Sequence, residues 1–384
     1  MDDLAQVRPR YGDASLTDVL PGVLAALGVP GAPDPLDLAG QLAGVRRVAV
    51  LLVDGLGHGL LPAAAAVAPA IADVVAGRLG TLRAITAAFP STTPTGLATV
   101  GTGAAPGAHG VLGFFVNVPG TARVLNHTDW GDDPDPYHWQ PLPTQFQRAA
   151  AAGVAVRVLS RPEYAGTGLT EAVYRGAAYA SAPDPDLLAE LMLSALAADA
   201  PALVYGYHPD LDKAGHRFGL NSDRWRAAAS DVDRLLARLV AGLPPDAALV
   251  VTADHGQLDV PAEARVDLDA DARLRAGVRV VAGEPRVRYL HTEPGATADV
   301  LATWRGVLGD AAWVATREEV VAAGWFGPVA AAHLGRIGDV VVACTGRHAV
   351  LAGGSEPAVV SQLVAYHGSW TAAEMIVPLL VIRP

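Results

Sequence analysis

The chain of 384 residues carries 28 Lys and Arg against 39 Asp and Glu, so its formal net charge is -11. This acidic balance argues against binding along a nucleic-acid backbone, which requires a clustered basic face. A single cysteine, Cys344, excludes an internal disulfide framework and a cysteine-based zinc cluster.

No apolar run in the sequence predicts a membrane span. The longest weakly polar stretch, residues 60–75, contains Pro62, Pro69 and Asp73, and a spanning helix needs about 20 apolar residues. The first residues, MDDLAQVRPR, lack the basic-then-apolar order of a secretory signal. We therefore expect a cytoplasmic protein that does not bind membranes. The sequence does not indicate an oligomeric state.

Short apolar runs alternate with Ala- and Leu-rich segments along the chain. This alternation is typical of an α/β three-layer sandwich, in which helices cover both faces of a mostly parallel sheet. The expected strands are near-continuous apolar runs, at Arg47 to Val53, Ala155 to Leu159, Ala202 to Tyr207, Ala248 to Thr252 and Met375 to Ile382. The expected helices are at Pro94 to Thr102, Leu142 to Ala152, Pro185 to Ala198 and Asp223 to Gly242.

Two segments look like additions to a single catalytic domain that spans residues 1–384. The first, residues 111–141, is rich in aromatic side chains, which favours either a lid that faces the substrate or an insertion that anchors itself with aromatics. The second, about 262–351, predicts a small α+β subdomain with strands at Val278 to Val281, Val287 to His291 and Asp339 to Cys344 and a helix at Thr297 to Leu308.

Asp and His residues follow the ends of several predicted strands. In open α/β sheets ligands bind at the carboxyl ends of the strands, so residues distant in sequence converge there. The i, i+4 spacing within HPDLDKAGH lets one helical turn present an Asp and a His on one face. The six residues are Asp54, Asp212, His216, Asp254, His255 and His367.

Three Asp and three His match what two divalent ions of the zinc type require. Carboxylate oxygens and imidazole nitrogens suit zinc, and two such ions can clamp the attacking and leaving oxygens of an in-line displacement. Taken singly, each residue has another interpretation. An Asp after a strand is often a helix cap, and a lone His is more often a hydrogen-bonded structural residue.

A run of hydroxyl side chains, PSTT, stands directly before a helix that begins near Pro94. A hydroxyl at a helix N-terminus lies among free backbone N–H groups that stabilise an anion, so beside a metal it can act as an alkoxide nucleophile. The alternative is an ordinary Ser or Thr helix cap.

These motifs together resemble the alkaline phosphatase superfamily. The motifs occur in the order found in that superfamily: an Asp after a strand, PSTT before a helix, the pairs TG and HG, then DxxxH, DHG and a final HG. Within the superfamily, the sequence is most similar to the type I phosphodiesterase/nucleotide pyrophosphatase branch. The resemblance implies an enzyme with two divalent metal ions per chain, zinc in this family. One ion would be held by Asp212, His216 and His367, and the other by Asp54, Asp254 and His255.

The resemblance also implies a nucleophile that contacts the metals, Thr93, with Thr92 as an alternative. The implied reaction is cleavage of phosphodiester or nucleotide pyrophosphate bonds in a small-molecule substrate, through a threonyl-phosphate intermediate. Other activities on the same fold are those of a phosphomonoesterase or a phosphonate C–P hydrolase, and a non-catalytic metal-binding homologue is a further possibility. The family lacks the positioned Arg of the phosphomonoesterases, which suits a diester because it carries one charge fewer.

One position departs from the family pattern. Where the family has an Asn that helps to hold the phosphoryl oxygen, this chain has Phe114. We expect Asn117 or Asn126 of the aromatic segment to supply the amide. Phe114 itself is expected to contact the substrate, and Trp130 and Tyr137 its leaving group.

Overall fold

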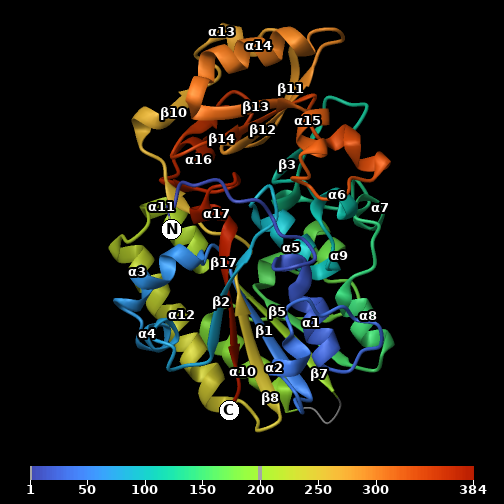
Figure 1. The fold of residues 1–384 in the computed structure, drawn as a ribbon, viewed down its shortest axis with the longest axis vertical. Helices are drawn as coiled ribbons and strands as arrows, with labels where there is room; N and C mark the ends of the chain where they lie inside the picture. Colours follow the sequence, from blue (N-terminus) through green and yellow to red (C-terminus); the bar gives the residue numbers. More distant parts are fainter. Residues whose placement is uncertain (1, 198–200) are drawn as a thin grey trace.

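The central element is a seven-stranded sheet in a computed structural model that describes residues 2–197 and 201–384 (Figure 1). The strand order is β2-β17-β8-β1-β7-β5-β6. β17 runs antiparallel to both of its neighbours, and the other strands are parallel to one another. In chain order the strands are β1 (Arg47–Val53), β2 (Thr81–Thr86), β5 (Ala155–Ser160), β6 (Ala178–Ser181), β7 (Ala202–His208), β8 (Ala247–Thr252) and β17 (Ile376–Ile382). The mostly parallel sheet expected from the sequence is confirmed.

All five predicted strands of this sheet are present, and their bounds differ from the predictions by at most one residue at each end. Two strands, β2 and β6, were not predicted. They lie at the two edges of the sheet and are partly exposed along their length. Edge strands bury few residues, so they lack the continuous apolar run by which the inner strands were found.

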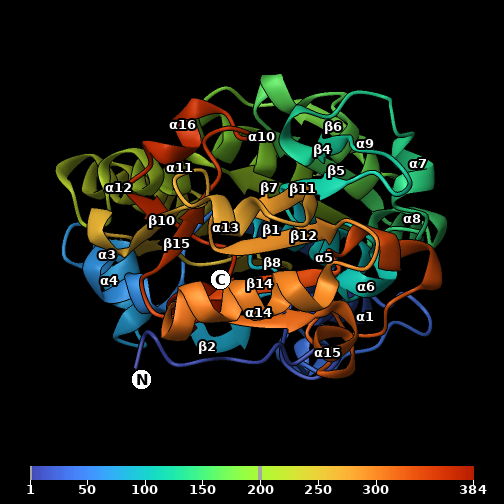
Figure 2. The ribbon, with the colours of Figure 1, turned by 90° about the horizontal axis from the view of Figure 1, so that it is seen from above.

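Helices cover both faces of the sheet (Figures 1 and 2). One group that packs together comprises α1 (Val19–Ala26), α2 (Leu38–Gln41), α5 (Thr93–Thr102), α8 (Gln145–Ala151) and α9 (Gly168–Val173). The other comprises α3 (Leu61–Ala65), α4 (Pro69–Val75), α10 (Pro185–Leu196), α11 (Asp210–Phe218) and α12 (Asp223–Gly242). The end of one predicted helix, at Ala198, lies outside the described residues.

The longest helix, α12, shows why these segments are helical. The Ser222 side chain accepts the backbone N–H of Trp225 and so caps the helix. The buried apolar residues then recur at helical spacing and form one face, which packs on α10 and α4. They are Trp225, Ala228, Ala229, Val232, Leu235, Leu236 and Leu239.

A second, four-stranded antiparallel sheet lies beyond one end of the central sheet (Figure 1). Its order is β11 (Val278–Glu284), β12 (Val287–Thr292), β14 (Val340–Cys344) and β13 (Ala312–Thr316). α13 (Ala272–Arg275), α14 (Thr297–Leu308) and α15 (Arg317–Ala322) accompany it. Residues of this sheet and of α14, among them Leu290, Trp304 and Val340, form a separate buried cluster. The α+β character expected for this segment is present, with β13 as an additional strand.

Short elements connect the two sheets. α6 (Pro106–His109) is followed by the β3 (Phe115–Asn117) and β4 (Val124–Asn126) hairpin and by α7 (Pro136–Trp139). β9 (Leu258–Asp259) pairs with β16 (Ala365–Tyr366), and β10 (Arg265–Asp267) pairs with β15 (Ala349–Leu351). α16 (Ala358–Ser361) and α17 (Ala372–Met375) precede the last strand. Within the described ranges, no helix is long and apolar enough to cross a membrane.

Candidate metal centre and active site

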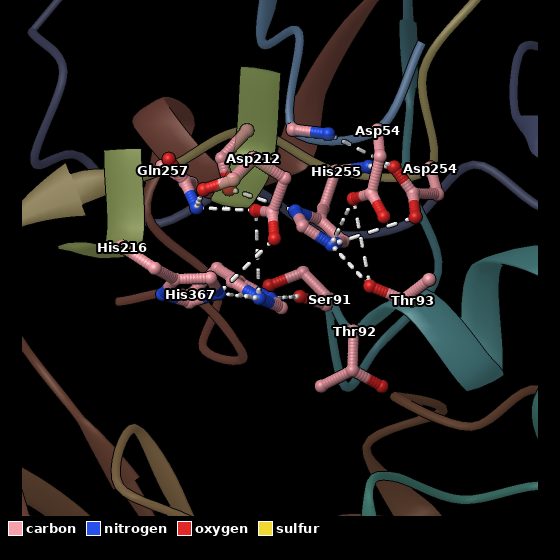
Figure 3. A network of polar contacts seen from close by, with 12 residues as sticks. Asp54, Ser91, Thr92, Thr93, Asp212, His216, Asp254, His255, Gln257 and His367 are labelled. Atoms are coloured by element: carbon pink, nitrogen blue, oxygen red, sulfur yellow. Dashed lines mark hydrogen bonds and ion pairs between the residues drawn. The ribbon is translucent and has the colours of Figure 1, made fainter. Parts of the chain in front are cut away.

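The six predicted Asp and His residues converge at one edge of the central sheet (Figure 3). Asp54 directly follows β1, Asp254 and His255 lie just beyond β8, and α11 after β7 carries Asp212 and His216. Since β17 runs antiparallel to β8, its first residues lie at the edge where the parallel strands end. The loop before β17 therefore adds the sixth residue, His367, to the same edge.

The first group consists of Asp54, Asp254 and His255, all of them buried. His255 Nε2 lies 3.4 Å from Asp54 Oδ1 and 3.5 Å from Asp254 Oδ2. The other Asp254 oxygen, Oδ1, accepts the backbone N–H groups of Gly55 and His255, whereas Oδ2 has no hydrogen-bond partner among the described residues. Two carboxylates and one imidazole nitrogen thus face a common point.

The second group consists of Asp212, His216 and His367. His216 Nε2 lies 3.2 Å from Asp212 Oδ2 and 3.1 Å from His367 Nε2. The two groups are adjacent, because the rings of His255 and His367 stack with their centroids 3.6 Å apart and their planes 12° apart.

Each of the three histidines has its other ring nitrogen next to a backbone carbonyl. The Nδ1 atoms of His216, His255 and His367 lie 2.7, 3.1 and 2.8 Å from the carbonyl oxygens of Ala365, Gly256 and Ser91. A carbonyl only accepts, so Nδ1 carries the hydrogen and Nε2 presents a lone pair to the group. This is the arrangement found around histidines that bind metals.

The electrostatics of the two groups fit divalent cations. Burial, followed by repulsion from Asp254 and Asp212, raises the pKa of Asp54 well above its ordinary value. Burial also raises the pKa of Asp254, whereas for Asp212 the effect of burial is outweighed by His216, and its pKa is lowered. The carboxyl groups of Asp54, Asp212 and Asp254 are buried close together, so they repel one another when they are ionised. A divalent cation among them would remove this repulsion and give Asp254 Oδ2 a partner.

The hydroxyl group of Thr93 belongs to this cluster, and that of Thr92 does not. Thr93 begins α5, and its Oγ1 lies 3.1 Å from His255 Nε2 and 3.5 Å from Asp54 Oδ1. Thr92 is the residue before the helix; its Oγ1 donates to Thr95 Oγ1 at 2.9 Å and points away from the group (Figure 3). Thr93 thus lies at the N-terminus of α5, where the N–H groups of Thr93 and Thr95 have no partner within the helix and Pro94 has no N–H.

A cavity of about 610 Å³ opens onto both groups and Thr93. Its walls are mainly apolar and come from the hairpin segment, from the loop after β5, and from the residues around α16. They include Phe114, Phe115, Tyr164, Leu169, Val360 and Tyr366. No arginine occurs among the described residues that line it, and Lys213 is its one lysine. The volume is that of a typical small-molecule site.

Two of the five residues expected to contact the substrate line this cavity, Phe114 and Asn126. The structure does not bring the other three to its wall. The amide nitrogen of Asn117 donates to the carbonyls of Thr121 and Arg123 inside the hairpin. Trp130 and Tyr137 make contacts away from the cavity.

Trp130 is buried, and its indole N–H donates to the Pro134 carbonyl. Its ring packs against His127, which accepts a hydrogen bond from Trp139. The Tyr137 ring is half exposed and lies under the guanidinium of Arg175. Trp130 and Trp139 therefore pack inside the segment, and Tyr137 contacts Arg175 outside it.

The structure adds two residues that the sequence patterns did not single out. The Tyr207 hydroxyl donates to Asp54 Oδ2, and the Gln257 amide donates to Asp212 Oδ1. Each orients a carboxylate of one group. Their positions in the sequence could have indicated a role in the site, because Tyr207 is the last residue but one of β7 and Gln257 directly follows the DHG motif.

Comparison with known proteins agrees with this geometry. The mostly parallel sheet, with candidate metal ligands gathered at one edge, defines an α/β protein of the metal-dependent hydrolase class. More particularly, a family model described as type I phosphodiesterase / nucleotide pyrophosphatase matches residues 48–370, and the chain belongs to this family of hydrolases. A search of curated protein sequences found no match.

Two kinds of solved structure share the fold. Murine ectonucleotide pyrophosphatase / phosphodiesterase 5 is 20% identical with a TM-score of 0.69, and the match covers 88% of each chain. An inactive form of it in complex with AMP gives a TM-score of 0.70 at 19% identity. Phosphonoacetate hydrolase from Sinorhizobium meliloti 1021, in complex with phosphonoformate, is 20% identical with a TM-score of 0.66, over 88% of this chain and 90% of that one.

Proposed function

We propose that this protein is a two-zinc enzyme that cleaves phosphodiester or nucleotide pyrophosphate bonds by way of a threonyl-phosphate intermediate. Asp212, His216 and His367 would hold one ion, and Asp54, Asp254 and His255 the other. The bound ions would lower the pKa of a nearby hydroxyl and neutralise charge on the phosphoryl group. The observation that carries the proposal is the position of Thr93 Oγ1, 3.1 Å from His255 Nε2 at the start of α5.

The chain's own residues account for the steps of the reaction. Thr93 Oγ1 gives up its proton to solvent water and attacks phosphorus, so that an O–P bond forms as the bond to the leaving oxygen breaks. The first N–H groups of α5 face the phosphoryl oxygens as negative charge develops on them. The leaving oxygen takes up a proton and departs into the cavity. The oxygen of a water molecule then bonds to phosphorus as the Thr93 Oγ1–P bond breaks. The phosphoryl group leaves as the phosphate product, and a proton of that water restores the Thr93 hydroxyl.

The nucleophile is tested by substitution and by trapping. Thr93→Ala should lower kcat by several orders of magnitude while both metals stay bound, because the six Asp and His ligands remain. If Thr93 only stabilised the start of α5, its loss would cost no more than about 1 kcal/mol of stability, as for a helix cap, and would leave kcat nearly unchanged. Thr93→Ser should retain appreciable activity, and Thr92→Ala should have a mild effect. Acid quench during turnover, followed by mass spectrometry, should locate the phosphoryl group on Thr93.

Two results would contradict this assignment. One is a phosphoryl group on Thr92, and the other is a Thr93→Ala enzyme with a rate within roughly tenfold of the parent.

The described residues of the cavity wall include no arginine, which supports a diester substrate. A phosphate monoester carries one more negative charge than a diester, and a guanidinium clamp rewards that extra charge. We therefore expect a higher kcat/KM for bis-p-nitrophenyl phosphate than for p-nitrophenyl phosphate. Phosphonoacetate belongs in the same assay, because one of the similar structures is a phosphonoacetate hydrolase. Preference for the monoester or for phosphonoacetate would replace the diester proposal.

A further inference from the structure

A buried carboxyl group that belongs to neither metal group lines the active-site cavity. Glu284 is the last residue of β11 in the four-stranded sheet, and it is 2% exposed. It shares the cavity with Thr93 and His367. The inserted subdomain therefore contributes an ionisable side chain to the cavity onto which both metal groups open.

Only one oxygen of this carboxyl group has a protein partner. Glu284 Oε2 accepts the backbone N–H of Phe114 at 3.2 Å. Oε1 is buried and has no hydrogen-bond partner among the described residues. A buried polar atom without a partner destabilises the folded protein, and such an atom in a cavity wall points to a ligand or another role.

Two glycines, Gly113 and Gly368, leave the space that the Glu284 side chain occupies. A Cβ atom on Gly113 would lie 2.8 Å from Glu284 Oε2, and one on Gly368 would lie 3.0 Å from its Cγ. Both glycines have a positive φ, 138° and 133°, which other residues rarely adopt. Gly368 directly follows His367, so the carboxyl group lies beside the loop that carries this residue.

Charge complementarity favours a neutral carboxyl group here. Burial raises the pKa of Glu284 to about 8, although the Phe114 N–H and Arg288 act in the opposite direction. The neutral form offers an O–H donor, whereas an ionised carboxylate would repel an anionic phosphate ester. A carboxylic acid kept neutral by an apolar site is an effective donor to an oxyanion.

We propose that Glu284 is a substrate-binding residue whose Oε1 hydroxyl group donates a hydrogen bond to a phosphoryl oxygen. It would do here what a side-chain amide at the position of Phe114 does in the family that the sequence resembles. A neutral donor adds no positive charge, so it suits the single charge of a phosphodiester. This inference rests on the phosphoryl-transfer function proposed above.

Asn126 is the competing donor, because it also lines the cavity. Its Oδ1 accepts the N–H and hydroxyl groups of Thr128 and so caps the turn after β4. This role fixes the side chain in the hairpin segment. Asn126→Ala therefore belongs in the same experiment.

The test compares two variants. Glu284→Gln keeps a hydrogen-bond donor at the end of the side chain, whereas Glu284→Met keeps the length of the side chain and removes the donor. Each zinc-loaded variant is assayed for kcat/KM with bis-p-nitrophenyl phosphate, for the Kd of inorganic phosphate by calorimetry, and for metal content. Glu284→Gln should stay within about threefold of the parent, and Glu284→Met should lose about 10- to 100-fold in kcat/KM and about tenfold in phosphate affinity, with metal content unchanged. Asp233→Ala is the matched control, because Asp233 is a buried carboxyl group that accepts one backbone N–H, that of Ile71, away from the cavity.

Three outcomes would overturn the inference. Glu284→Met could equal the parent in both kcat/KM and phosphate affinity, Glu284→Gln could be as impaired as Glu284→Met, or the Met variant could lose metal. A loss found in Asn126→Ala and absent from Glu284→Met would assign the donor to Asn126 instead. If the parent cleaves no diester, the proposed function fails, while the phosphate affinities still test Glu284.

Discussion

At the scale of single residues, the histidines of the site owe their chemistry to hydrogen bonds made on the far side of the ring. A backbone carbonyl lies within hydrogen-bond distance of Nδ1 in each of His216, His255 and His367. The tautomer that leaves the Nε2 lone pair free is thereby fixed before any ion binds. The cost of orienting these side chains is met during folding, which favours tight binding.

Removal of one histidine from either group should remove one ion. His216→Ala and His255→Ala each leave two protein ligands on one side, so each variant should contain one divalent ion per chain where the parent contains two. Elemental analysis after gel filtration measures this directly. His348→Ala is the control, since the His348 ring contacts the Thr345 carbonyl outside both groups. Full activity of the parent in a strong chelator, with no metal detected, would refute the two-ion arrangement.

At the scale of elements, a buried ion pair joins the four-stranded sheet to the loops of the site. Arg286 follows β11, and both of its contacts with Glu374 of α17, at 2.9 and 2.7 Å, are fully buried. Glu374 also accepts the N–H of Ser369, and its carbonyl accepts the N–H of Gly256, directly after His255. The pair therefore holds the loops that carry His255 and His367.

Breaking this pair should affect both stability and metal binding. Arg286→Met leaves the Glu374 carboxylate buried without its charge partner, which typically costs about 3–5 kcal/mol. We expect this loss in the free energy of unfolding from urea titration, together with weaker metal binding. Arg10→Met removes an exposed pair with Asp13 and should cost less than about 1 kcal/mol. Equal, small losses in both variants would show that the buried pair does not support the site.

The elements also show how far the sequence could predict the molecule. Inner strands such as β1 are buried along almost their whole length, so a continuous apolar run in the sequence predicts them. A polar residue such as Asp54 directly after the run is then easily recognised as a candidate ligand. Edge strand β2 is half exposed and lacks such a mark. The sequence could not predict Glu284 as a residue of the cavity, for a different reason. Its position depends on how the four-stranded sheet packs on the loops of the site, and the residues next to it in the sequence form no pattern that indicates this packing.

At the scale of the whole molecule, buried neutral histidines should make stability depend on pH. Burial lowers the pKa of His109 to about 3 and that of His127 to about 4, whereas an unfolded histidine titrates near 6.5. Above pH 6.5 both states are neutral and these groups have no effect on stability. As the pH falls from about 6.5 toward 4, these histidines bind protons in the unfolded chain and stay neutral in the native protein. The free energy of unfolding therefore decreases.

Urea unfolding at several pH values between 7.5 and 4.5 measures this dependence. His127→Gln should show a shallower decrease in the free energy of unfolding over that range than the parent. If the two proteins lose stability equally, the dependence comes from other groups, such as the carboxyl groups of the site.

The position of β17 in the sheet has a consequence for the order in which the protein is made. β17 lies between β2 and β8, so the strand that pairs with β2 is synthesised after β8 and long after β2 itself. His367 precedes β17 and emerges equally late. A nascent chain thus carries Asp54 and Thr93 long before their neighbours exist, and we expect phosphoryl transfer to begin only after synthesis has passed β17.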